Sequence, residues 1–164
     1  MKILIASDTH GNLVALSHVL SFGKIQGVEA IIHCGDWCDG QAVKTILKVD
    51  IPLYAVMGNC DEAHKEEVWE VLQGATEKNQ NLLETELDNR KIAIAHQPEK
   101  ISSHIQSGKF DAIFHGHLHM SASVKATGNT LIVNPGALGS TPKPSFAIYD
   151  TKTNTAELIE IPTL

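Results

Sequence analysis

Short apolar runs alternate with helical patterns in the first part of the chain, and this alternation constrains the fold more than any other feature. Residues 2–6, 30–33 and 52–56 are apolar runs of strand length. Between them, apolar residues recur at helical spacing, first after the predicted helix cap Asn12 and again over 39–49. Strands that alternate with helices predict βαβ units and a parallel sheet.

The rest of the chain predicts more strands and fewer helices. We expect helices over 62–73 and 98–107, strands over 82–87, 91–95 and 111–114, and hairpins over 121–133 and 145–161, with turns at 127–129 and 151–154. No internal repeat or linker interrupts the sequence. We therefore expect one domain over residues 1–164, in which two sheets pack together with helices outside.

Composition and charge exclude several classes of protein. Hydrophobic residues make up 43% of the chain, but no run approaches the roughly 20 apolar residues of a membrane span. The apolar N-terminal stretch is too short for a signal peptide, and three cysteines without framework spacing fit a reducing compartment, so we expect a cytoplasmic protein. The net charge of −6 argues against binding to a nucleic-acid backbone, which requires basic surface.

Polar residues that can bind metals follow five of the predicted strands, at the point where each strand ends. They are Asp8, His10, Asp36, Asn59, His96, His117 and His119. The carboxyl ends of parallel strands face a common crevice in open α/β sheets, so we expect these side chains to meet. Each motif alone also fits a turn, a helix start or a His-rich surface loop. Their coincidence at five strand ends favours a shared site.

The seven side chains exceed the needs of one tetrahedral ion and suit two ions that share a carboxylate. Imidazole, carboxylate and amide ligands together favour Mn, with Ni, Fe, Zn or Co as alternatives. Two ions about 3.5–4 Å apart can clamp a phosphoryl group and supply a hydroxide nucleophile at neutral pH.

The ordered set Asp8-x-His10, Gly35-Asp36, Gly58-Asn59, His96 and Gly116-His117-x-His119 resembles the motifs of the calcineurin-like metallophosphoesterase superfamily, in its small bacterial and archaeal phosphodiesterase branch. The resemblance implies a four-layer α-β-β-α sandwich of two mixed sheets with a dinuclear site. It implies that Asp8, His10, Asp36 and His119 bind one ion. It also implies that Asp36, Asn59, His96 and His117 bind the other, with Asp36 bridging the two.

The chain departs from the family pattern at two positions. Many members carry a histidine after the motif asparagine, where it donates a proton to the leaving group, and this chain has Cys60 there. A glycine often follows the fourth-motif histidine, where this chain has Gln97. We expect Asn59, Cys60 and His96 to lie nearest the chemistry. A metal-rich site is expected to lower the pKa of the Cys60 thiol.

The function that these observations predict is a divalent-metal-dependent phosphodiesterase acting on a small phosphate ester. The alternative is a metal-binding scaffold of the same fold with little catalysis, as in a eukaryotic relative that serves the retromer coat. His18 and His104 are expected on exposed helix faces, whereas His33 and His115 are expected in the core or in support of the ligands, and not as ligands themselves. Cys34 and Cys38 are too few for a structural zinc site, and apolar strand surface near 121–133 allows a homodimer.

Overall fold

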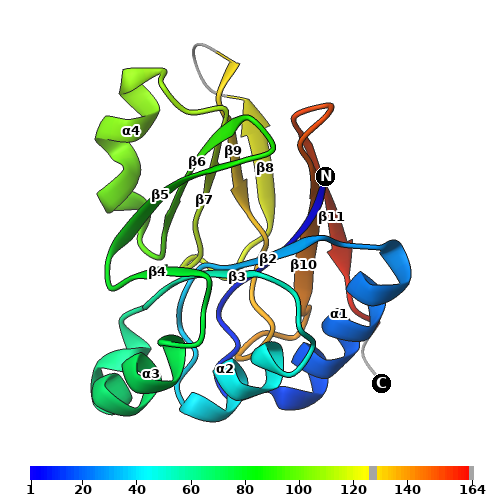
Figure 1. Cartoon of the computed structure of the whole chain (residues 1–164), viewed down its shortest axis with the longest axis vertical. Coiled ribbons are helices and arrows are strands. Elements are labelled where there is room, and N and C mark those ends of the chain that lie inside the picture. The colour runs from blue at the N-terminus through cyan, green and yellow to red at the C-terminus, as the bar shows by residue number, and fades with distance from the viewer. Residues whose placement is uncertain (126–128, 163–164) are drawn as a thin grey trace.

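A computed structural model describes residues 1–125 and 129–162. Strands and helices alternate through the first half of the described chain (Figure 1). In chain order these are β1 (Lys2–Ala6), α1 (Leu13–Gln26), β2 (Ala30–His33), α2 (Gly40–Leu47), β3 (Leu53–Val56), a 3₁₀ helix (Cys60–His64), α3 (Lys65–Leu72) and β4 (Glu77–Asn79). The second half contains β5 (Leu82–Leu87), β6 (Arg90–Ala95), a 3₁₀ helix (Pro98–Ile101), α4 (Ser102–Ser107), β7 (Ala112–Phe114), β8 (Ala122–Lys125), β9 (Leu131–Asn134), β10 (Ser145–Asp150) and β11 (Thr155–Glu160).

The strands form two mixed sheets. In the first sheet the order is β11-β10-β1-β2-β3-β4, with β1 to β4 parallel, β10 antiparallel to β1, and β11 antiparallel to β10. In the second sheet the order is β5-β6-β7-β9-β8, with β6, β7 and β9 parallel. Each sheet therefore has a parallel centre whose strands all end at the same edge, which is the arrangement that gathers ligands in α/β folds.

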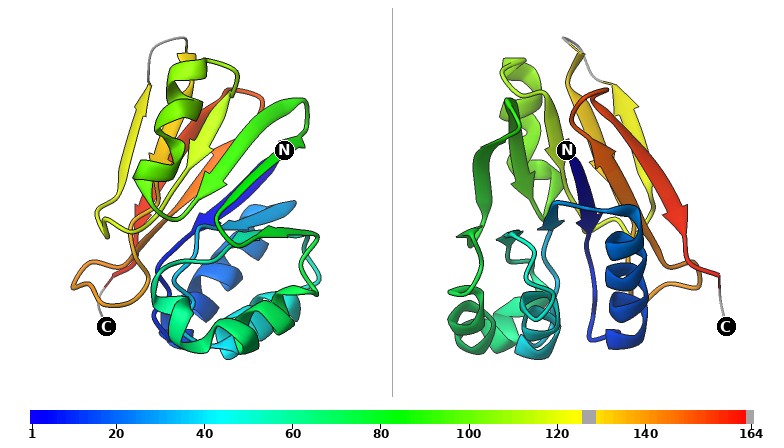
Figure 2. Two further views of the ribbon diagram at one scale, coloured as in Figure 1. Left: turned by 90° about the vertical axis from the view of Figure 1, so that its left-hand side faces the viewer. Right: turned by 45° about the vertical axis from the view of Figure 1, so that its right-hand side comes forward.

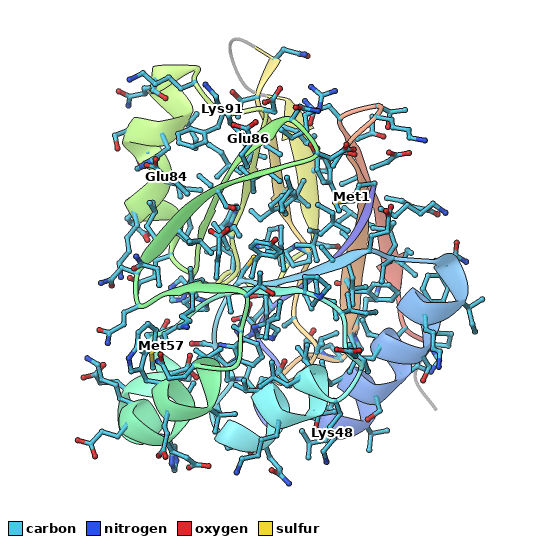
Figure 3. All side chains as sticks on the ribbon, viewed as in Figure 1. Met1, Lys48, Met57, Glu84, Glu86 and Lys91 are labelled. Carbon is cyan, nitrogen blue, oxygen red and sulfur yellow. The ribbon has the colours of Figure 1, made fainter. Side chains whose placement is uncertain are left out.

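Alternating side chains of β1 show why the fold has four layers. Ile3 and Ile5 are buried between the two sheets, whereas Leu4 is buried against α1, α2 and α3. A smaller apolar cluster around Ile113 lies between the second sheet and α4. The order of layers is thus helices, sheet, sheet and helix, and it is visible in the turned views of Figure 2. Side chains fill the space between the layers (Figure 3).

Several boundaries agree with the sequence. The Asn12 side chain caps α1 by accepting a hydrogen bond from the Ala15 N–H at 3.1 Å. Gly27 ends that helix in a left-handed conformation, with φ of 68°. Two predicted helices, 62–73 and 98–107, each begin as a 3₁₀ turn before the α-helix. The strand β4 was not predicted, because its residues are polar and at least partly exposed.

Part of one predicted hairpin lies outside the described residues. The predicted turn at 127–129 and the end of the strand predicted over 121–126 include residues 126–128. β8 and β9 flank this stretch as an antiparallel pair. A homodimer through this surface stays a prediction. Within the described ranges, no helix is both long and apolar enough to cross a membrane.

Candidate metal centre

The loop after β1 is tied to the loop after β2 by backbone hydrogen bonds. The Asp8 N–H donates to the Gly35 carbonyl at 2.9 Å, and the His10 N–H donates to the Asp36 carbonyl at 3.1 Å. The loop after β7 joins them because the His117 N–H donates to Oδ2 of Asp8 at 3.1 Å. The side chains predicted from separate strand ends are therefore held together by a fixed backbone frame.

The backbone of this frame is strained at the candidate ligands. Left-handed conformations are uncommon outside glycine, and they persist where the surrounding structure enforces them. Five of the candidate residues have φ between 45° and 72°, namely Asp8, His10, Asp36, His117 and His119. Such outliers cluster at functional sites in proteins, so the strain is itself evidence for a site here.

The Asp36 carboxylate has its two oxygens directed to two different groups. Oδ2 lies 3.8 Å from Nε2 of His10. Oδ1 lies 3.3 Å from Nε2 of His96 and accepts a hydrogen bond from the Cys60 N–H at 2.9 Å. One buried carboxylate thus stands between two sets of imidazoles, and the bridging role that the family resemblance implies for it stays a prediction.

The first set consists of Asp8, His10, Asp36 and His119, whose ligand atoms all lie within 4.8 Å of one another. Nε2 of His119 lies 3.1 Å from Nε2 of His10 and 3.2 Å from Oδ1 of Asp8. Asp8 is fully buried, and its Oδ1 has no hydrogen-bond partner among the described residues. A buried carboxylate oxygen without a donor is costly, so these residues fit a bound cation.

The second set centres on His96. Its Nε2 lies 3.0 Å from Oδ1 of Asn59, and the His117 ring stands nearly perpendicular to the His96 ring with the ring centres 5.2 Å apart. Nδ1 of His96 contacts the Cys34 carbonyl oxygen at 2.9 Å. That contact places the proton on Nδ1 and leaves Nε2 free to bind a cation. The structure therefore brings all seven predicted side chains to one edge of the two sheets.

The charges at the centre are strongly coupled. Burial alone would raise the pKa of the Asp36 carboxyl, but the hydrogen bond and charge of His96 and the Cys60 N–H outweigh burial and lower this pKa to about 2. Burial would lower the pKa of His96, but Asp36 outweighs it and raises that pKa. Asp36 is therefore ionised at neutral pH and is ready to accept a cation.

Gly116 lets the loop after β7 lie close against the loop after β1. A Cβ atom built at this glycine would lie 2.6 Å from Oδ2 of Asp8 and would collide with Oγ of Ser7. Real Cβ atoms do not approach other atoms so closely. The glycine before His117 is thus required by packing against the first strand end, and not only by its turn.

Cys60 lies beside the second set, as predicted. The Asn59 amide contacts its Sγ at 3.8 Å. Burial raises the pKa of the Cys60 thiol to about 12, and the Asp36 carboxylate adds to the effect. The lowered pKa expected from the sequence concerns a site that holds cations, and it stays a prediction.

The remaining histidines divide between core and surface. His33 and His115 are buried, as predicted, and His18 is exposed on α1. The prediction that His104 is exposed was wrong, because it is partly buried and its Nε2 lies 2.9 Å from a glutamate of β5.

A cavity of about 180 Å³ opens beside Asn59 and His96. Its wall includes Lys65, Lys100 and Asn81, and the Lys100 ammonium donates to Oδ1 of Asn81 at 2.6 Å. Two lysines, several amides and Glu62, which forms an ion pair with Lys65 at 3.3 Å, thus line a small space beside the second set. Sequence analysis missed the two lysines and Asn81 because they come from α3, the loop before β5 and the second 3₁₀ helix.

Two further residues escaped sequence analysis. The Cys38 Sγ lies 3.2 Å from Nδ1 of His10, opposite the nitrogen that faces His119. The Asp61 carboxylate is fully buried and accepts hydrogen bonds from the N–H groups of Cys38 and Gly58 at 2.8 Å and 2.7 Å. The position of Asp61 just after Gly58-Asn59-Cys60 was the available signal, but spacing does not show that it joins two loops.

A family model for the calcineurin-like phosphoesterase superfamily domain matches residues 1–154. The chain belongs to this superfamily. The phosphodiesterase MJ0936 of Methanocaldococcus jannaschii is 30% identical over 159 residues, which cover 93% of this chain and 94% of that protein. The family resemblance predicted from the motifs is therefore confirmed.

Several solved structures match the fold. An archaeal phosphodiesterase superimposes with a TM-score of 0.85 at 27% identity, over 98% of this chain and 100% of that one. The phosphoesterase Yfce of E. coli gives a TM-score of 0.69 at 20% identity, over 99% and 100% of the two chains. Vps29 of Entamoeba histolytica, in complex with zinc, gives 0.62 at 15% identity, over 98% of each chain. The last two show the fold alone, and the predicted fold class is confirmed.

Proposed function

We propose that this calcineurin-like phosphoesterase is a phosphodiesterase that uses two divalent cations, with Mn as the first choice and Ni, Fe, Zn or Co as alternatives. The observation that carries the proposal is the Asp36 carboxylate, whose Oδ2 faces His10 while Oδ1 faces His96. A carboxylate in that position can serve two cations at once. The unpartnered Oδ1 of buried Asp8 supports the same conclusion.

In this proposal the chain's side chains hold and orient the cations. Asp8, His10 and His119 serve one cation, Asn59, His96 and His117 serve the other, and Asp36 serves both. Two bound divalent cations supply polarisation of the phosphoryl oxygens and activation of water. The strained backbone fixes the ligands before binding, so little reorganisation is required when a cation or substrate arrives.

The substrate in this proposal is a small phosphate ester. The cavity beside Asn59 and His96, about 180 Å³ in volume, receives the leaving group, and its amides and charged side chains (Lys100, and Lys65 paired with Glu62) favour a polar one. The net charge of −6 gives no general attraction for a nucleic-acid backbone. We place the protein in the cytoplasm, as a single domain.

Purified protein, reconstituted with Mn²⁺, tests the proposal. Elemental analysis should find two cations per chain, and bis-(p-nitrophenyl) phosphate should be hydrolysed faster than p-nitrophenyl phosphate. Chelation should abolish turnover, and added Mn²⁺ should restore it. Saturation at one cation per chain would refute the dinuclear assignment. Absence of turnover with every divalent cation tried would favour the scaffold role.

A further inference from the structure

Two thiols lie close together beside the candidate metal centre. The Sγ atoms of Cys38 and Cys60 and a ring nitrogen of His10 all lie within 4.8 Å of one another. Both are partly exposed, whereas Cys34 is fully buried in the core between the sheets. A reagent from solution can therefore reach this pair, and Cys34 is shielded from it.

The backbone ties the loop of Cys38 to the loop of Cys60. The buried Asp61 carboxylate binds the N–H of Cys38 on one loop and the N–H of Gly58 on the other. A Cβ built at Gly35 would lie 2.7 Å from the Gly58 nitrogen, so the loops are in direct contact. Cys38 itself has a left-handed backbone, with φ of 66°. The two tied loops thus hold the Cys38 and Cys60 sulfurs within 4.8 Å of each other.

We propose that Cys38 and Cys60 form a reversible disulfide, and that this bond weakens cation binding at the centre. The covalent part stands on the thiol geometry alone, and the effect on cations rests on the proposed function. Disulfides in reducing compartments are mostly transient and redox-sensing, which is the role that a thiol pair at the edge of a metal centre fits.

The reaction is a thiol–disulfide exchange with a small disulfide such as oxidised glutathione. One protein sulfur attacks a glutathione sulfur, the glutathione S–S bond breaks, and the departing glutathione thiolate takes up the proton. The second protein sulfur then attacks the mixed disulfide and releases another glutathione, which takes up the second proton. The Sγ–Sγ bond forms, the two cysteines are oxidised, and one glutathione disulfide is reduced to two thiols.

The disulfide would disturb side chains of both ligand sets. Cys38 loses the thiol that faces Nδ1 of His10 at 3.2 Å, so the ring loses the partner that orients Nε2 toward the first set. Cys60 adjoins Asn59, whose oxygen faces His96 at 3.0 Å. Loss of such supporting contacts typically costs about 10–100-fold in metal affinity.

The experiment equilibrates the full chain, without cations, in glutathione buffers from fully reduced to fully oxidised. An equilibrium measurement is chosen because burial raises the pKa of both thiols and slows their attack. Free thiols are counted after denaturation, and the masses of intact protein and of non-reduced peptides are measured. We expect the count to fall from three to one, the mass to fall by two hydrogens, and a linked peptide pair to contain Cys38 and Cys60.

Mn²⁺ binding to the reduced and oxidised proteins is then compared by equilibrium dialysis. We expect the oxidised protein to bind about 10-fold more weakly or worse, and dithiothreitol to restore binding. The Cys34→Ala variant should form the same internal bond as wild type and should lose Mn²⁺ affinity on oxidation to the same extent. Cys38→Ser and Cys60→Ser should form no internal bond, and oxidation should leave their Mn²⁺ affinity unchanged from that of the same variant when reduced.

Three results would overturn the inference. They are thiols that stay free in fully oxidised glutathione, glutathione adducts or linked chains in place of the internal bond, and a bond that leaves Mn²⁺ affinity unchanged. A reduced protein that binds no Mn²⁺ would instead reject the proposed function, because the masses report the bond without reference to cations.

Discussion

The His96 imidazole and the Asp36 carboxylate lie 3.3 Å apart, Nε2 to Oδ1, and both side chains are 2% exposed. The other Asp36 oxygen faces His10 on the opposite side. Among the described residues, Asp36 is the one carboxylate found between both imidazole sets. Replacing Asp36 should therefore weaken the binding of both cations.

Asp36→Asn should weaken Mn²⁺ binding at both sites and abolish turnover. The amide keeps an oxygen for the Cys60 N–H, so the fold should survive while the negative charge is lost. The loss of affinity should exceed the roughly 10–100-fold typical of outer contacts to a metal ligand. Isothermal titration with Mn²⁺ measures it. The control is His18→Ala, on the exposed face of α1. Near-normal activity in Asp36→Asn would show that the bridging assignment is wrong.

Gly116→Ala should lose cation affinity, because the new Cβ would press against Oδ2 of Asp8 at 2.6 Å. Gly108→Ala is the matched control, since Gly108 has φ of 62° and open space around it. It should cost about 1–2 kcal/mol of folding stability through backbone strain, with Mn²⁺ binding intact. Urea unfolding and Mn²⁺ titration of both variants separate the two effects. Equal Mn²⁺ affinity in the two variants would contradict the packing argument.

His33 should make the protein less stable in mild acid. Its ring is fully buried, stacks on Trp37 with the ring centres 3.5 Å apart, and contacts the Thr9 hydroxyl at 2.8 Å. Burial, and next the charge of His96, lower the pKa of His33 to about 3. The folded-state pKa lies below the ordinary value, so its contribution is complete above about pH 6.5 and is lost as pH falls toward 3.

Urea unfolding at pH 7, 6, 5 and 4, in the presence of a chelator, measures this effect. Within the window, His33 should remove about 1.4 kcal/mol of unfolding free energy per pH unit. His33→Asn should be less stable at pH 7 and should show a shallower decline, because the unfolded chain then has one fewer proton to gain. Identical slopes in the two proteins would show that His33 is not the source.

Cys60→His should improve substrates with poor leaving groups more than those with good ones. A leaving alkoxide needs a proton, whereas a nitrophenolate departs without one, and general acid help is typically worth about 10²–10⁴-fold. The Cys60 thiol, with its pKa raised to about 12, is a weak acid. Cys60→Ser should barely change nitrophenyl diester hydrolysis. The measurement is rate against leaving-group pKa, and parallel lines for wild type and Cys60→His would exclude position 60 as the donor's place.

Sequence analysis could predict that the seven side chains lie close together because each motif follows an apolar strand. Asp8 follows β1 and Asp36 follows β2, and parallel pairing of these strands brings their ends together. Recognising this pattern requires only the local hydrophobic periodicity and the rule that parallel strands end at a common edge of the sheet. Strand β4 was not predictable in this way, since it has no apolar side chain and is defined by its pairing with β3.

The contact between Cys38 and His10 was also beyond sequence analysis. It depends on the left-handed backbone at Cys38 and on Asp61, which ties together two loops from different parts of the chain. Neither feature changes the hydrophobic pattern that sequence analysis reads.

The candidate ligands come from both sheets, with Asp8, Asp36 and Asn59 following strands of the first sheet and His96 and His117 following strands of the second. Any cation bound by ligands from both sheets would therefore link the two sheets of the sandwich. Native protein that binds a ligand is stabilised in proportion to the logarithm of ligand concentration. The resistance of this chain to cellular proteases would then depend on the supply of that cation in the cell. A shortage of the cation would lower the amount of protein as well as its activity.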